Sequence, residues 1–140
     1  MTGDEIIATL ALEPHPEGGW YRQTWIAEDG PRPSGTCIYF LLRAGERSHW
    51  HRVDATEIWH FYAGAPLMLR QAVSVEGPAD QHWLGPDLTS GARPQVIVPE
   101  GVWQSAETTG DWTLVGCTVS PAFQFSGFEL APPDFGIPDS

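Results

Sequence analysis

The chain has 140 residues, a length that suits one domain with a core of its own, and we expect a single domain over residues 1–140. It contains seven arginines and no lysine, which excludes lysine Schiff-base chemistry. Its formal net charge of −11 argues against binding to nucleic acid or to an anionic membrane. The sequence shows neither a signal-peptide pattern nor an apolar run of about 20 residues, so we expect a cytoplasmic protein whose partners are small molecules or other proteins.

The first element that the sequence predicts is a short amphipathic helix over residues 2–12. Thr2 and Glu5 have the spacing of a capping box, and Ile6 and Leu10 recur at helical intervals. This helix should pack on the outside of the domain.

After Pro14 the pattern changes to short segments rich in β-branched and aromatic residues, separated by Gly, Pro and Asp. Strands are predicted at 18–28, 36–43, 47–53, 56–62, 66–75, 95–98, 102–107, 112–119 and 123–130. So many short strands indicate an all-β sandwich or barrel. We expect a surface loop at 76–91 and a loosely held tail at 131–140.

Two of the predicted strands are apolar on both faces, namely TCIYFLL near residue 40 and TLVGCTV near residue 115. A strand of this kind lies in a sheet whose outer surface is covered as well as its inner one. We therefore expect a homodimer, in which a second copy covers the sheet.

The stretch SHWHRVDATEIWHFYAG, residues 48–64, contains three histidines and a glutamate. Alternate side chains of a strand share one face, so His49 and His51 are predicted to point the same way. If the following turn places Glu57 on that side, two imidazoles and a carboxylate meet inside the barrel, and this ligand set suits first-row divalent metals. His60 shares its face with apolar residues and is interpreted as structural.

These residues resemble the first cupin motif, G(x)5HxH(x)3–4E(x)6G, which would run here from Gly45 to Gly64. Val53 stands at the position of the second motif histidine. The second cupin motif, PxGxxH(x)3N, is similar to the stretch that begins at Pro99, with Gln104 in place of its histidine.

Four stretches in order resemble the motifs of one small cupin family of largely uncharacterised function. They are PHPEGGWYRQ (14–23), SHWHRVDATEIWHFYAG (48–64), VPEGVWQ (98–104) and CTVSPAFQFSGFE (117–129). The resemblance covers nearly the whole chain. It implies an all-β cupin jelly-roll barrel, usually a homodimer, which here would carry the short N-terminal helix.

Two interpretations of the site remain open. In the first, a divalent metal (Fe, Mn, Zn or Ni) is bound by His49, His51, Glu57 and Gln104. In the second, no metal is needed. His51 and Glu57 are then a catalytic acid/base pair that moves a proton near neutral pH, as the resemblance to metal-free isomerases and epimerases of the cupin superfamily implies.

The residues predicted to bind a substrate are Glu17, Tyr21, Gln23, Tyr39, Trp59 and Gln104. Two roles stay open for Glu17: it faces the pocket mouth, or it caps a turn at a β-bulge. His15 and His82 are expected in loops and receive no role.

The sequence thus predicts a small-molecule-binding cupin that acts by proton transfer, as an isomerase, epimerase or lyase, on a sugar-like or organic-acid substrate. Two alternatives belong to other classes of function. One is a non-catalytic binding protein that uses the same pocket, and the other is a metal-dependent oxygenase in which His49, His51 and Glu57 form a facial triad.

Overall fold

The computed structural model describes all of residues 1–140. It contains one α-helix, eleven strands and two 3-10 turns. In chain order these are α1 (Gly3–Leu10), β1 (Glu13–Pro14), β2 (Trp20–Ile26), β3 (Thr36–Arg43), β4 (Arg47–Val53), β5 (Thr56–Gly64), β6 (Leu67–Ala72), β7 (Asp80–Leu84), η1 (Leu88–Ser90), β8 (Gln95–Val98), β9 (Trp103–Thr108), β10 (Trp112–Ser120), η2 (Phe125–Gly127) and β11 (Phe128–Leu130).

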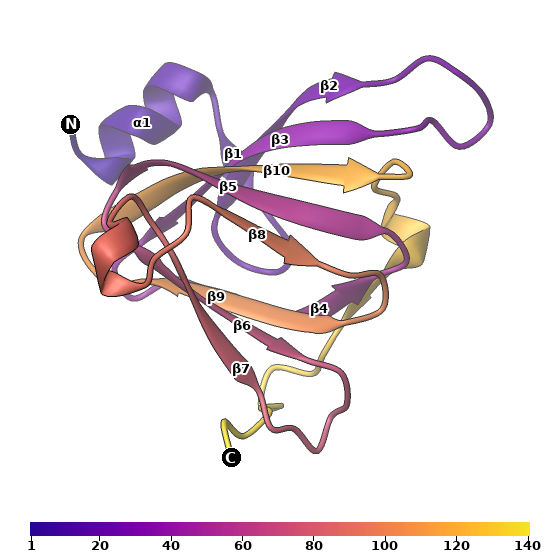
Figure 1. Cartoon of the computed structure of the whole chain (residues 1–140). Helices are drawn as coiled ribbons and strands as arrows, with labels where there is room; N and C mark the ends of the chain where they lie inside the picture. Colours follow the sequence, from indigo (N-terminus) through magenta and orange to yellow (C-terminus); the bar gives the residue numbers. More distant parts are fainter.

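The strands form two antiparallel sheets that face each other across the core (Figure 1). One sheet has the order β1-β2-β3-β10-β5-β8 and the other the order β11-β4-β9-β6-β7. Inward-facing side chains such as Phe40, Leu69 and Val115 fill the space between them. The predicted all-β jelly roll with a short N-terminal helix is confirmed. The helix α1 lacks the length and the apolar character needed to cross a bilayer.

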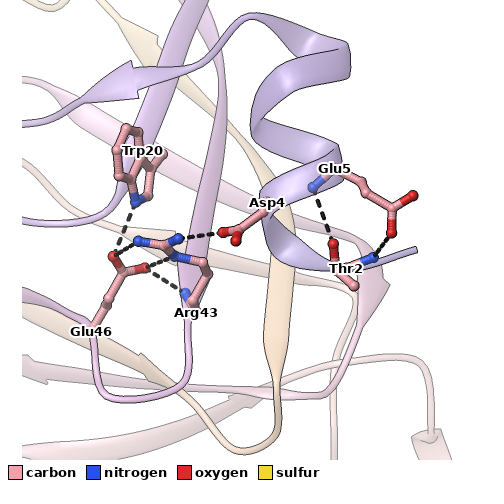
Figure 2. A network of polar contacts seen from close by, with 6 residues as sticks. All are labelled: Thr2, Asp4, Glu5, Trp20, Arg43 and Glu46. Carbon is pink, nitrogen blue, oxygen red and sulfur yellow. Dashed lines mark hydrogen bonds and ion pairs between the residues drawn. The ribbon is translucent and has the colours of Figure 1, made fainter.

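The helix α1 begins where the sequence predicts. The Thr2 hydroxyl accepts a hydrogen bond from the Glu5 N–H, and the Glu5 carboxylate accepts one from the Thr2 N–H, so the capping box is present (Figure 2). The buried Ile6 packs with Leu12 against Leu41, which lies on the outer face of β3.

A polar network at the end of β3 holds α1 against the sheet (Figure 2). Arg43 forms ion pairs with Asp4 of the helix and with Glu46, and the Trp20 indole N–H donates to Glu46 at 3.0 Å. The outer face of β3, for which a second copy was expected, is therefore partly covered by the chain's own helix.

The rest of the outer face of the six-stranded sheet keeps large apolar side chains in contact with solvent. Trp25 on β2, Tyr62 on β5 and Ile97 on β8 are all about half exposed. The loop that connects β2 and β3, residues 27–35, projects beyond the end of the sheet (Figure 1).

The C-terminal residues 131–140 are not the loose tail that was predicted. Ala131 and Ile137 are buried beside Trp50 and Trp103 on the outer face of the second sheet. The C-terminal segment shields those two indoles from solvent. Two smaller differences are the strand β7 within the predicted loop 76–91 and the turn η2, which interrupts the strand predicted at 123–130.

Candidate active site

A cavity of about 170 Å³ lies between the two sheets. Two carboxyl groups and two imidazoles share it with aromatic and aliphatic side chains. Its lining consists of His15, Glu17, Tyr21, Gln23, Thr36, Ile38, Phe40, His51, Val53, Glu57, Trp59, Cys117, Val119, Phe123 and Phe125.

A bulge in β4 determines which residues of this strand face the cavity. Ser48 pairs with Ala106, yet His51 pairs with Gln104, so β4 contains one more residue than β9 between these two pairs. Ser48 and His51 are consequently both buried on the inner face, at 0% and 1% exposure, although they are three residues apart.

The extra residue places His49 on the outer face, beside Trp50. The His49 Nε2 atom lies 2.8 Å from the carbonyl oxygen of Pro132 in the C-terminal segment. The prediction that His49 and His51 share a face is therefore wrong, because the bulge breaks the alternation on which it relied.

The backbone fixes the tautomer of His51. The Nδ1 atom is 2.7 Å from the carbonyl oxygen of His49, which can only accept, so Nδ1 carries the hydrogen. In the neutral ring the lone pair is then on Nε2, which lies 3.6 Å from Glu17 Oε1. Burial lowers the pKa of His51, and the neutral form is favoured.

A tight turn brings Glu17 into the cavity. The Gly18 N–H donates to the His15 carbonyl oxygen at 3.0 Å, and the His49 N–H donates to the Glu17 carbonyl oxygen at 2.8 Å. Gly18 has φ 109°, and a Cβ atom there would lie 2.1 Å from the carbonyl oxygen of Arg47. Only glycine fits this approach. Of the two roles considered for Glu17, the structure supports the one in the pocket, because Glu17 lines the cavity.

The Glu17 carboxyl group is the centre of a polar cluster. The Ser48 hydroxyl donates to its Oε2 atom, and His15 Nδ1 lies 3.3 Å from its Oε1 atom. Burial raises the pKa of Glu17 and lowers that of His15. His15 was not predicted as a site residue, and the only signal for it was its place two residues before Glu17 in the PHPEGG stretch.

Glu57 enters the cavity from β5 in the six-stranded sheet, and Gln104 holds its carboxyl group. The Trp59 indole N–H, which can only donate, donates to Gln104 Oε1 at 2.8 Å, so the amide nitrogen must face Glu57. Gln104 Nε2 donates to Glu57 Oε1 at 2.9 Å. Burial raises the pKa of Glu57 to about 7, although His51 acts in the other direction.

The four side chains predicted as metal ligands do not converge. His49 lies on the outer face, and Gln104 presents its N–H rather than its oxygen to the site. No group of three or more His, Cys, Asp or Glu side chains has a geometry that could hold a metal ion. This arrangement of donors does not fit the predicted metal.

The other predicted binding residues divide between the two faces of the first sheet. Tyr21 and Gln23 line the cavity. Tyr39 does not, because Ile38 and Phe40 point inward and leave it on the outer face with the residues that pack near α1. The prediction that Tyr39 lines the pocket is wrong.

Two aromatic residues of the C-terminal segment complete the pocket wall. Phe123 and Phe125 pack edge to face, with 5.0 Å between their ring centroids, and both line the cavity. Both residues were predicted to lie in a strand and to have no role in the site. His60 lies on the outer face, where its Nε2 atom is 3.1 Å from the Thr118 hydroxyl.

Comparisons with known proteins agree with this fold. Residues 4–131 match the profile of a family described as "Cupin superfamily (DUF985)". A protein of Shewanella oneidensis of known crystal structure is 44% identical, with a TM-score of 0.88, over 94% of this chain and 85% of that one. A hypothetical protein from Leishmania major is 29% identical, with a TM-score of 0.84, over 94% and 88% of the two chains.

More distant structures share the fold alone. Oxalate decarboxylase from Bacillus subtilis is 12% identical, with a TM-score of 0.65, and the match covers 84% of this chain but 29% of that enzyme. No functionally curated protein matches the chain at a significant level.

Proposed function

We propose that this chain, which belongs to the DUF985 family of the cupin superfamily, is an enzyme that transfers a proton on a small polar substrate, as an isomerase, epimerase or lyase. The observation that supports this most is the group formed by Glu17, His51 and Glu57, buried in a largely apolar cavity. Removing ionisable groups from water opposes folding, and perturbed groups of this kind are concentrated at functional sites.

His51 has the properties of a general base. Its Nδ1–H is held by the His49 carbonyl, so the ring orientation is fixed and the Nε2 lone pair is free to accept a proton. The imidazolium that forms would be stabilised by Glu17 Oε1, 3.6 Å away.

Glu57 has the properties of the second acid/base group. With a pKa of about 7 it exists in both protonation states at neutral pH, so it can give or accept a proton. His51 comes from β4 in one sheet and Glu57 from β5 in the other. A substrate between them could lose a proton to one group and gain a proton from the other, which is the requirement of an isomerisation or epimerisation of a sugar-like or organic-acid compound.

The two alternatives differ in their support. A non-catalytic binding protein would use the same cavity and is distinguished by experiment. An oxygenase built on His49, His51 and Glu57 has no structural support, because His49 lies on the outer face of β4.

Deuterium incorporation from solvent tests the proposal. The protein is incubated in D2O with a panel of aldoses, ketoses, their amino derivatives, and 2-hydroxy and 2-keto acids, and C–H exchange is followed by NMR. We expect exchange with at least one compound, and a loss of about 100-fold or more in His51→Gln and Glu57→Gln.

The control is Glu28→Gln, which removes an exposed carboxyl group outside the cavity and should exchange as the wild type does. If no compound exchanges faster with the wild type than with Glu57→Gln, proton-transfer catalysis is rejected. Binding of a panel compound without exchange would then favour the binding protein.

A further inference from the structure

We infer that the substrate carries an organic ammonium group, which the cavity receives between Glu17 and Glu57. This inference rests on the proposed function only in placing the substrate in the same cavity. It narrows the substrate class from sugar-like compounds and organic acids to small amines, such as an amino-substituted polyol.

The charge of the cavity favours a cationic ligand. Its lining contains the carboxyl groups of Glu17 and Glu57 but no arginine or lysine. The two imidazoles do not supply a positive charge for an incoming group, because His15 Nδ1 and His51 Nε2 both face Oε1 of Glu17, at 3.3 and 3.6 Å. An incoming carboxylate would be a third acid in a small space with no free cation to meet it.

The balance of hydrogen-bond donors and acceptors in the cavity also favours an ammonium group. Glu57 accepts one hydrogen bond from Gln104, and Glu17 accepts one from the Ser48 hydroxyl. An ionised carboxylate offers about four acceptor positions, so both groups retain unused positions. An ammonium group has three N–H donors and no acceptor, which is the complement of what these two carboxylates offer.

The aromatic wall of the cavity suits an organic cation as well. Tyr21, Phe40, Trp59, Phe123 and Phe125 line the same cavity. Aromatic ring faces attract cations, and their apolar area suits the carbon skeleton of an amine. The cavity volume of about 170 Å³ is smaller than the roughly 300–1,000 Å³ of pockets that hold drug-sized ligands, so the ligand must be small.

The same observations favour an organic cation over a metal ion. A metal ion requires several donor atoms within about 2.0–2.6 Å. No group of three or more His, Cys, Asp or Glu side chains in the chain meets that condition. An ammonium group binds through hydrogen bonds of about 2.8 Å, so it does not need such a close set of donor atoms.

The groups around Glu57 determine how binding depends on pH. They are His51 on β4, Glu17 on the turn before β2, Gln104 on β9 and Cys117 on β10. Raising the pH ionises Glu57, whose pKa is about 7, and keeps His51 neutral. The ionisation of Glu57 makes the cavity more negative. The affinity for an ammonium compound should therefore rise between pH 6 and pH 8.

Three matched probes test the inference on the wild-type protein. They are 2-aminopropane-1,3-diol as its ammonium ion, glycerol, in which a hydroxyl replaces the ammonium group, and glycerate as the anion. Dissociation constants are measured by NMR titration at pH 6 and pH 8. At pH 8 we expect the ammonium compound to bind at least about tenfold more tightly than glycerol, which is about 1.4 kcal/mol, and glycerate not to bind.

Two variants locate the preference. Glu17→Gln and Glu57→Gln should each reduce the ratio of ammonium to glycerol affinity about tenfold, whereas Glu28→Gln should keep it. The inference is overturned if glycerate or glycerol binds as well as the ammonium compound, or if none of the three binds. It is equally overturned if Mn²⁺ or Zn²⁺ binds at micromolar concentration and displaces the ammonium compound.

The outcome is separable from that of the proposed function. Deuterium exchange on a neutral sugar that depends on His51 and Glu57 would preserve proton transfer while the charge inference fails. Selective ammonium binding without exchange on any compound would preserve the charge inference while catalysis is rejected.

Discussion

Replacement of Glu57 by glutamine should stabilise the protein above neutral pH. Glu57 is only 7% exposed, and burial raises its pKa from the ordinary 4.5 to about 7. The folded state therefore prefers the protonated acid. The stability that this group contributes is fully present below about pH 4.5 and is lost as the pH rises through about 7. At about 1.4 kcal/mol for each tenfold change in acidity constant, the loss is about 3 kcal/mol.

Glutamine has nearly the shape of the protonated acid and keeps an oxygen that can accept from Gln104. Urea unfolding of both proteins between pH 4.5 and pH 8.5 measures the difference in free energy of unfolding. We expect a difference near zero at pH 4.5 that grows to about 3 kcal/mol in favour of Glu57→Gln at pH 8.

The lowered pKa values of His15 and His51 act in the opposite direction, since their contribution is lost as the pH falls below about 6.5. Both proteins contain these histidines, so the comparison largely removes their effect. The exposed control Glu28→Gln should give no such gain at pH 8. A difference that does not change with pH, or a variant that is less stable at pH 8, would refute the reasoning.

Three further outcomes are expected. Gly18→Ala should lose much more stability than Gly101→Ala in urea unfolding, and equal losses would contradict this. Both glycines have positive φ, but only at Gly18 would the added Cβ atom meet backbone, at 2.1 Å. Gln104→Leu leaves the Trp59 indole and Glu57 without their partner and should cost about 2–4 kcal/mol at pH 6, whereas a loss below 1 kcal/mol would mean that water replaces the amide. Light scattering at micromolar concentration should give a mass of about twice 15.4 kDa, and a monomer mass would reject the homodimer. The reason is that the outer face of the six-stranded sheet keeps exposed apolar side chains, which a second copy would cover.

The parts of the fold that depend on local interactions could be predicted from the sequence. The capping box of Thr2 and Glu5 needs only neighbouring residues, and most strands follow from alternating apolar side chains. The strand β7 was missed because it lies at a sheet edge and only Leu84 of its five residues is buried. The packing of Ile137 depends on residues far away in the sequence, so no local sequence pattern predicts it.

The candidate site was predicted as a set of residue types rather than as a geometry. His51, Glu57 and Gln104 were found through motif positions, and the structure brings them to one region. The opposite faces of Tyr39 and its neighbours were decided by strand pairing that the sequence leaves open. His15 was missed because a turn, and not a strand, carries it into the cavity.

The bulge in β4 explains why this sequence resembles a metal centre although its side chains do not form one. In a regular strand, with His51 facing inward, His49 would face inward as well and Ser48 would face outward. The extra residue reverses both positions, so that a hydroxyl donor instead of a second imidazole enters the cavity. That hydroxyl donates to Glu17, and this bond helps to hold a second carboxyl group beside His51. The bulge thus exchanges a nitrogen ligand for a supported acid, and the proposed preference for an ammonium group depends on this exchange.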